Sequence, residues 1–162
     1  MDDRICRIKR KILNKNIKIK KTVGIEKIKE LEAKLKIVLP KELIDFYTLI
    51  SNGGEMLDGF NLYSFDEWKY NSNKVSQDFP FENYWIWEEE EDTEFDVLDN
   101  GNIELIDIGD SQTWNIIVSG KQYGKMWFFS NVGIQPAAPS RTFLDWFEYW
   151  LDGNDNYFTD FS

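Results

Sequence analysis

The side chains that could do chemistry in this sequence are carboxylates and tryptophans rather than histidines or cysteines. The 162-residue chain contains 29 Asp and Glu, 7 Trp, no histidine and a single cysteine, Cys6. Without histidine the chain lacks the base of Ser-His-Asp and Cys-His enzymes, the ligand of His-bound zinc and imidazole acid–base chemistry. A single cysteine also excludes an internal disulfide, a CxxC redox pair and a Cys₄ metal site.

The densest group of these residues is an acidic run that follows two tryptophans. Like charges repel, so such a run is typical of a solvated loop, and the tryptophans could equally belong to the core. A tryptophan beside dense charge is also typical of a protein interface, where an aromatic anchor sits inside an electrostatic rim. The candidate partner-binding residues are therefore Trp85, Trp87, Glu88, Glu89, Glu90, Glu91, Asp92 and Glu94.

The other motifs predict no catalytic, metal or cofactor site. Asp96–Gly101 has the start of an EF-hand spacing, but with Gly101 at the sixth position Leu98 falls where an oxygen ligand is required. A turn at Asp99–Gly101 is the better interpretation. The glycines are not followed by a phosphate-binding pattern, and nothing in the sequence places two carboxylates across a pocket. We therefore expect a protein that is not an enzyme and needs no cofactor.

Charge is divided unevenly along the chain. Residues 1–36 contain 13 Lys and Arg against 5 Asp and Glu, a net charge of +8, whereas residues 37–162 contain 6 against 24, a net charge of −18. A body this acidic repels nucleic acid and anionic membranes, and it attracts a basic protein. No apolar run approaches the roughly 18 residues of a spanning helix, and no export signal is found, so we expect a cytoplasmic protein.

Residues 1–24 are predicted to form a basic arm or an edge strand. Lys15–Val23 alternates polar and apolar residues, which is typical of a strand at a sheet edge. A solvated, frayed terminus is the main interpretation. An arm that binds nucleic acid is disfavoured, because the segment has no aromatic side chains on which bases could stack.

The rest of the chain predicts an α+β fold with a mainly antiparallel sheet flanked by helices, in one domain over residues 25–162. Apolar residues at helical spacing predict helices that begin at Ile25, Pro40 and Thr142. Trp127 and Phe147 fall on inferred buried faces. Short apolar runs between the second and third helices predict strands in Phe60–Phe65, Tyr84–Trp87, Ile103–Ile108, Trp114–Val118 and Lys125–Ser130.

An ordered set of motifs resembles the SUKH superfamily, which includes the Smi/Knr cell-wall assembly regulators. Leu39-Pro40 is followed by Asn52-Gly53-Gly54, then by Ile108-Gly109-Asp110, and finally by the aromatic helix after Thr142. The resemblance spans Ile25–Gly153 and implies an α+β fold without catalysis. Bacterial members typically act as immunity proteins that bind a cognate toxin domain, often a nuclease.

The resemblance carries over no binding residue, because the pockets of the family vary with the toxin. The function it implies here is neutralisation of a cognate toxin, which the acidic body predicts to be basic. The alternative is a non-catalytic regulatory scaffold of the cell-wall assembly type. The identity of the toxin and the oligomeric state stay open at this point.

Overall fold

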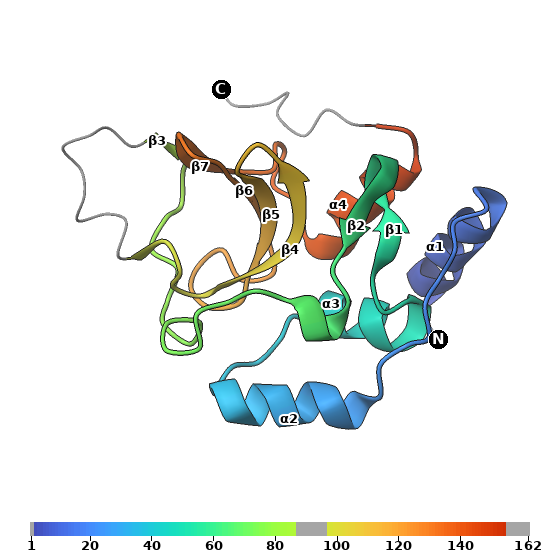
Figure 1. The fold of residues 1–162 in the computed structure, drawn as a ribbon, viewed down its shortest axis with the longest axis horizontal. Helices are drawn as coiled ribbons and strands as arrows, with labels where there is room; N and C mark the ends of the chain where they lie inside the picture. The colour runs from blue at the N-terminus through green and yellow to red at the C-terminus, as the bar shows by residue number, and fades with distance from the viewer. Residues whose placement is uncertain (1, 87–96, 155–162) are drawn as a thin grey trace.

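The computed structural model describes residues 2–86 and 97–154 (Figure 1). The helices are α1 (Asp3–Asn14), α2 (Ile25–Leu35), α3 (Lys41–Asp45) and α4 (Phe143–Leu151), with a π-helical turn η1 (Phe46–Ile50) and two 3₁₀ turns, η2 (Leu57–Gly59) and η3 (Phe65–Glu67). The strands are β1 (Gly54–Met56), β2 (Phe60–Leu62), β3 (Trp85–Ile86), β4 (Asn102–Gly109), β5 (Gln112–Ile117), β6 (Met126–Phe129) and β7 (Gly133–Pro136).

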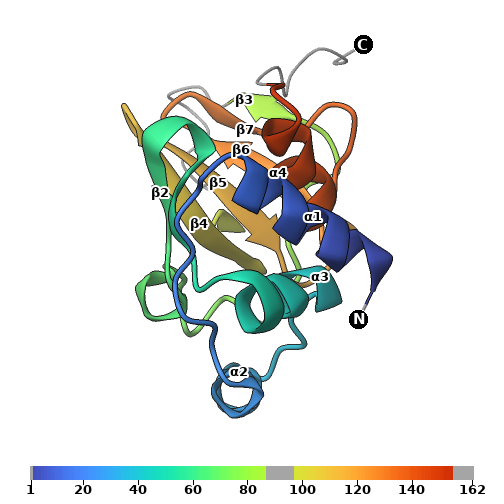
Figure 2. The ribbon, with the colours of Figure 1, turned by 90° about the vertical axis from the view of Figure 1, so that its right-hand side faces the viewer.

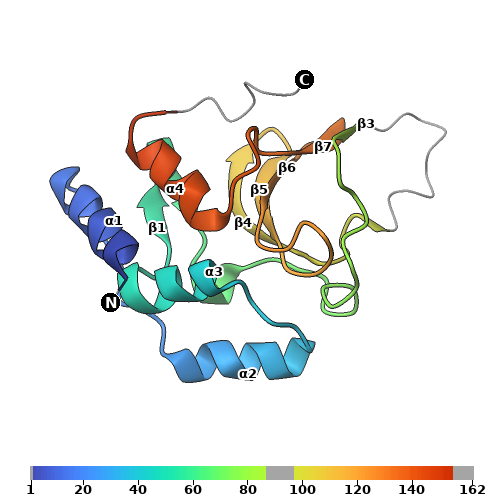
Figure 3. The same cartoon turned by 180° about the vertical axis from the view of Figure 1, so that it is seen from behind.

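These strands form one seven-stranded sheet in the order β1-β2-β4-β5-β6-β7-β3. Each neighbouring pair is antiparallel, which confirms the predicted α+β class. On one side of the sheet α1 and α4 lie next to each other, and α3 with η1 continues the layer (Figure 2). The view from behind shows α2 beyond α3, at the edge of the molecule (Figure 3).

Most of the predicted elements are confirmed within two or three residues. The helices predicted from Ile25, Pro40 and Thr142 correspond to α2, to α3 continued by η1, and to α4. Two strands were not predicted, β1 and β7, because three or four residues are too few to show alternation. Thr142 is the N-cap of α4, but its side chain makes no capping hydrogen bond, and instead the Leu144 amide donates to Glu42 of α3 at 2.9 Å.

The prediction for the N-terminus is wrong. Asp3–Asn14 is helix α1, and its Ile5, Ile8 and Ile12 are buried against the core rather than solvated. Their three- and four-residue spacing is helical, but the lysines and arginines between them hid the pattern. The following segment, 17–24, is irregular rather than a strand, although its Lys20 amide donates to the Ser51 hydroxyl beside β1 at 2.8 Å.

Two clusters of buried side chains form the interior. The larger one joins the helices to the near face of the sheet, where Phe147 of α4 lies 4.8 Å from Phe46, between ring centroids, in an edge-to-face contact. A smaller cluster on the far face contains Phe79, Ile117, Trp127 and Ile134. Trp127 and Phe147 are both fully buried, as predicted, but they lie in different clusters.

A network of ion pairs fastens α1 to α4. The carboxylate of Glu148 accepts from Arg7 Nε at 2.5 Å and from Arg7 NH2 at 2.7 Å, and it also accepts from Lys11 Nζ at 2.8 Å. Arg4 pairs with Asp145 on the same helix, and Lys11 with Asp152. The hydrogen bonds from Arg7, helped by Lys11, lower the pKa of Glu148 from 4.5 to about 2 despite its burial.

We expect Phe147→Ala to lower the free energy of unfolding by about 3–5 kcal/mol, because it leaves a cavity between α4 and η1. Chemical denaturation followed by tryptophan fluorescence measures this. Leu13→Ala is the control, since Leu13 is 68% exposed and its truncation should change stability little. Equal stability of the two variants would mean that α4 does not pack as described.

We expect Glu148→Gln to destabilise the fold by about 1.5–3 kcal/mol at neutral pH. Because the pKa of Glu148 is lower in the folded state, its contribution is present above its ordinary value of 4.5 and is lost as the pH falls toward 2. Denaturation of both proteins at several pH values should therefore show a difference that shrinks below pH 4.5. A difference that stays constant across that range would contradict the assignment.

Candidate functional site

The predicted partner-binding residues lie largely outside the described residues. Trp85 belongs to β3, where its backbone is opposite Ile134 of β7, and its side chain is not described. Trp87, Glu88, Glu89, Glu90, Glu91, Asp92 and Glu94 all fall between the two described ranges. Their role in binding stays a prediction.

The described residues on either side of this acidic segment are attached to the same part of the molecule. Before it, β3 pairs with β7 through Trp85 and Ile134. After it, Leu98 packs against the smaller cluster, which also contains Ile134. The described residues on both sides of this segment therefore lie at the end of the sheet that is remote from α1 (Figures 1 and 3).

Beside the smaller cluster, the described residues form a polar pocket of about 330 Å³ on the face of β4 and β5 that points away from α4. Its walls come from the segment after η3 and from the turn before β4, and its floor comes from the two strands. The lining residues are Lys69, Tyr70, Asn71, Asp99, Asn102, Glu104 and Asn115. A volume near the lower end for ligand pockets suits one side chain or a small polar group rather than an extended ligand.

Two buried asparagines hold the floor of this pocket. Asn102 and Asn115 are 5% and 6% exposed, and Asn115 Nδ2 donates to Asn102 Oδ1 at 2.9 Å across the two strands. Asn102 Nδ2 donates in turn to the carbonyls of Leu98 and Asn100, at 2.7 and 3.1 Å. Because buried amides are costly when unpaired, this network ties the turn that carries Asp99 to the sheet.

A β-bulge decides which side chains face the pocket. Glu104 of β4 lies opposite Asn115 of β5, but Ile106 lies opposite Trp114, so Leu105 is the extra residue. Ordinary alternation would place Glu104 and Asp107 on opposite faces of the sheet, since they are three residues apart. The extra residue places Asp107 opposite Thr113, on the same face as Glu104, and leaves Leu105 and Ile106 both buried.

Glu104 is held from two sides at the edge of the pocket. The Tyr63 hydroxyl donates to Glu104 Oε2 at 2.6 Å, and Lys69 Nζ lies 3.9 Å from the same oxygen and 5.5 Å from the centre of the Tyr63 ring. Burial, the hydrogen bond to Glu104 and nearby negative charge raise the pKa of Tyr63. Tyr63 therefore stays a protonated donor at neutral pH, and Glu104 Oε2 accepts its hydrogen bond.

Two other pockets in the described residues lie closer to the basic N-terminal part of the chain. One, of about 520 Å³, lies between the end of α1, the β1–β2 hairpin and Trp150, and is lined by Lys15 and Lys18. The other, of about 390 Å³, lies where α2 begins and is lined by Lys21 and Lys27. The lining of each also contains carboxylates: Glu55 and Asp58 in the first pocket, and Asp66 in the second.

The described part of the chain contains no group of three acidic, cysteine or histidine side chains placed to hold a metal ion. Asp99–Gly101 is a turn, as predicted. Gly101 has a φ of +61°, and it lies so close to the backbone of residues 77–79 that a Cβ atom would clash there. None of the described helices is both long and apolar enough to cross a bilayer.

Sequence reasoning missed the polar pocket. Asn102, Glu104 and Asp107 interrupt an otherwise apolar strand, and Thr113 and Asn115 do the same in the next one. That pattern signals a strand face that is neither simply solvated nor part of the core. The register that joins these positions depends on the bulge at Leu105, which the sequence pattern does not reveal.

Comparisons with known proteins identify one family. The model of the SMI1 / KNR4 family (SUKH-1) matches residues 22–153, which include every strand, the pocket and helices α2 to α4. Helix α1 precedes the matched range. No curated protein and no solved structure matches the chain.

We expect Asn102→Ala to lower the free energy of unfolding by about 1–3 kcal/mol, because it leaves the buried Asn115 and two partly buried carbonyls without their partner. Asn73→Ala is the matched control, since Asn73 is exposed in the loop beside the pocket. Urea denaturation of both variants measures the difference. A loss no larger in Asn102→Ala than in the control would show that the network does not brace the floor.

Proposed function

The chain belongs to the SMI1 / KNR4 family (SUKH-1), and from this premise we propose that it is an immunity protein that neutralises a cognate bacterial toxin domain. The proposed mode is binding alone, without a catalytic step. The absence of histidine and the single cysteine support this mode, because they remove the commonest nucleophile–base pairs. The partner is a protein domain that carries a basic surface, such as a nuclease.

The observation that carries this proposal is the unbalanced negative charge around the polar pocket. Three carboxylates, Glu104, Asp107 and Glu67, all act to raise the pKa of Tyr63, so their fields overlap at that residue. Asp99 adds a fourth carboxylate on the pocket wall, and Lys69 is the cation in its lining. Such a surface speeds encounter with a basic partner and repels nucleic acid.

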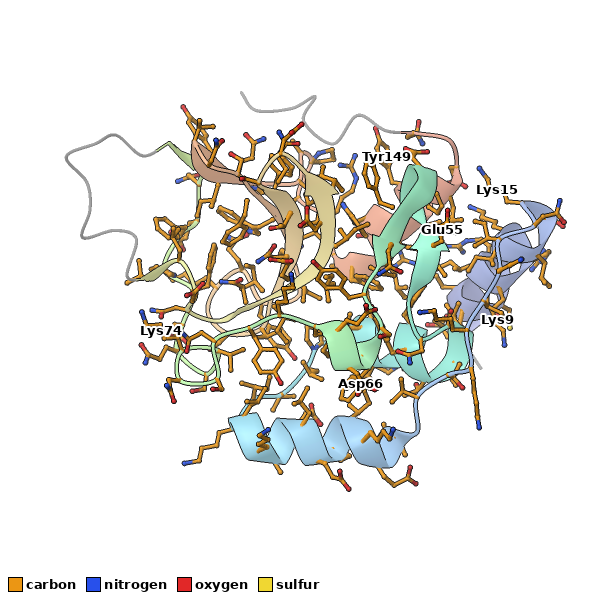
Figure 4. The ribbon with its side chains drawn as sticks, viewed as in Figure 1. Lys9, Lys15, Glu55, Asp66, Lys74 and Tyr149 are labelled. Carbon is orange, nitrogen blue, oxygen red and sulfur yellow. The ribbon has the colours of Figure 1, made fainter. Side chains whose placement is uncertain are left out.

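The basic residues of α1 do not cancel this charge. Arg4, Arg7 and Lys11 pair with carboxylates of α4 or α3, so their charge is balanced locally. Lys9 and Lys15 lie at the α1 end of the molecule, whereas Lys74 lies at the opposite end, near the pocket loop (Figure 4). The carboxylates around the pocket are therefore not neutralised by the cations of α1, and they are available to a basic partner.

The proposed binding surface contains the pocket and, as a separate prediction, the acidic run. Both described ends of that run lie at the smaller cluster, next to the strands that form the pocket floor. A partner large enough to cover a standard interface of about 800 Å² would extend from the pocket across this part of the sheet.

The test is binding to the toxin domain encoded by the neighbouring gene, measured by stopped-flow association and by inhibition of the toxin. Replacing Glu88, Glu89, Glu90 and Glu91 with Gln should slow association and flatten its dependence on salt between about 50 and about 300 mM, since surface charges are screened over about 8 Å. Dissociation and thermal stability should change little.

The control removes the same amount of charge elsewhere, from exposed carboxylates on α2 and the β1–β2 hairpin: Glu26, Glu30, Glu55 and Asp58. If both variants slow association equally, the acidic run acts only through net charge. If the unmodified protein neither binds nor inhibits the neighbouring toxin, the proposed function is wrong.

A further inference from the structure

We propose that the polar pocket of Lys69, Asp99, Asn102, Glu104 and Asn115 is a receptor for the guanidinium group of a single arginine side chain on a partner protein. The inference rests on the proposed function only in taking the partner to be a basic protein. The recognition itself follows from which pocket atoms are already hydrogen-bonded and which are not.

Most polar atoms on the floor of the pocket already make hydrogen bonds within the protein. Both oxygens and nitrogens of the Asn102–Asn115 pair are in use, because Thr113 Oγ1 donates to Asn115 Oδ1 at 2.7 Å and Asn102 bonds the turn carbonyls. Glu104 is different: Tyr63 and Lys69 both approach Oε2, and no described group donates to Oε1. One carboxylate oxygen of this pocket-lining residue is therefore an open acceptor.

The charges in the pocket favour a cation. Its lining contains two carboxylates, Asp99 and Glu104, against one ammonium, Lys69. Lys69 is 65% exposed, and its 3.9 Å separation from Glu104 is too long for a hydrogen bond, so it neutralises that carboxylate poorly. An incoming cation can displace Lys69 into solvent at little cost.

A guanidinium fits better than an ammonium. Because a guanidinium is more weakly hydrated than an ammonium, moving it into a partly enclosed pocket costs less desolvation free energy. Its planar fork can also donate to several acceptors at once. The acceptors here lie on different parts of the pocket, with Asp99 on the wall formed by the turn and Glu104 on the floor at β4. A planar donor group can bridge a wall and the floor, whereas an ammonium acts as a point charge.

The pocket is also prepared in advance for such a group. Lys69 and Glu104 form an antiparallel bridge, with the Glu104 amide donating to the Lys69 carbonyl at 2.8 Å, so one wall is fixed to the floor. The asparagine network fixes the other wall through Asn100 and Leu98. Little conformational freedom is then lost when an arginine binds, which favours affinity.

The first experiment uses N-acetyl-arginine amide as the probe and follows the side-chain amide signals of Asn102 and Asn115 by NMR. We expect a saturable shift, and a much weaker one with the neutral isostere N-acetyl-citrulline amide. Glu104→Gln should weaken arginine binding about tenfold, because the charge is lost while Tyr63 keeps an acceptor. Lys69→Met should strengthen it about two- to fivefold by removing the competing cation.

Arginine recognition predicts opposite effects on arginine affinity for the two substitutions. If the two residues only maintained the shape of the pocket, both substitutions would weaken binding. Glu55→Gln on β1 is the matched control for net charge and should leave the titration unchanged. The proposal is overturned if citrulline binds as well as arginine, or if Lys69→Met weakens binding as Glu104→Gln does. Because the Lys69 side chain is exposed, Lys69→Met should fold normally. The measurement on Lys69→Met therefore tests the proposal even if Glu104→Gln fails to fold.

A second experiment separates this inference from the proposed function. In binding to the neighbouring toxin, Glu104→Gln should raise the dissociation rate about tenfold and Lys69→Met should lower it. A toxin that binds tightly but is indifferent to both substitutions overturns the arginine receptor and leaves the immunity function intact. An arginine probe that binds when the toxin does not overturns the immunity function and leaves the receptor intact.

Discussion

The two faces of the sheet depend on the register between β4 and β5, and on the extra residue that β4 carries at Leu105. With Leu105 bulged, Ile103 and Ile106 face the helices while Glu104 and Asp107 face the other way. A strand without the bulge would turn one of the two carboxylates into the larger cluster, where an unpaired charge is very costly. The same residue therefore protects the core under α4 and gathers the acceptors of the pocket.

The second organising constraint is the pairing of α1 with α4. Helix α1 brings three buried isoleucines and three paired cations to a domain whose family match begins at residue 22. Glu148 is the carboxylate that meets all three of those cations, and its lowered pKa reflects its hydrogen bonds with Arg7 and Lys11. This pairing balances the charges of Arg4, Arg7 and Lys11 within the fold, so these three cations do not oppose the acidic character of the remaining chain.

Sequence reasoning predicted the elements well where periodicity was uninterrupted, as in α2, α4 and β4. It failed at α1, because lysines and arginines between Ile5, Ile8 and Ile12 made an amphipathic helix look like a solvated arm. It also failed at the pocket, since Lys69, Asp99 and Asn115 come together only through the bulged register and the turn before β4. Long-range pairing of this kind has no local signature. The acidic run, which the sequence does single out, lies outside the described residues.

Cys6 provides a single site for chemical attachment at one end of the molecule. It is exposed on α1, and the sequence contains no other cysteine. Figure 1 places α1 at the end of the molecule away from β3 and β7. A maleimide linker would therefore react at one defined point and tether every molecule to a sensor surface in the same orientation, with the far end of the sheet directed toward the analyte.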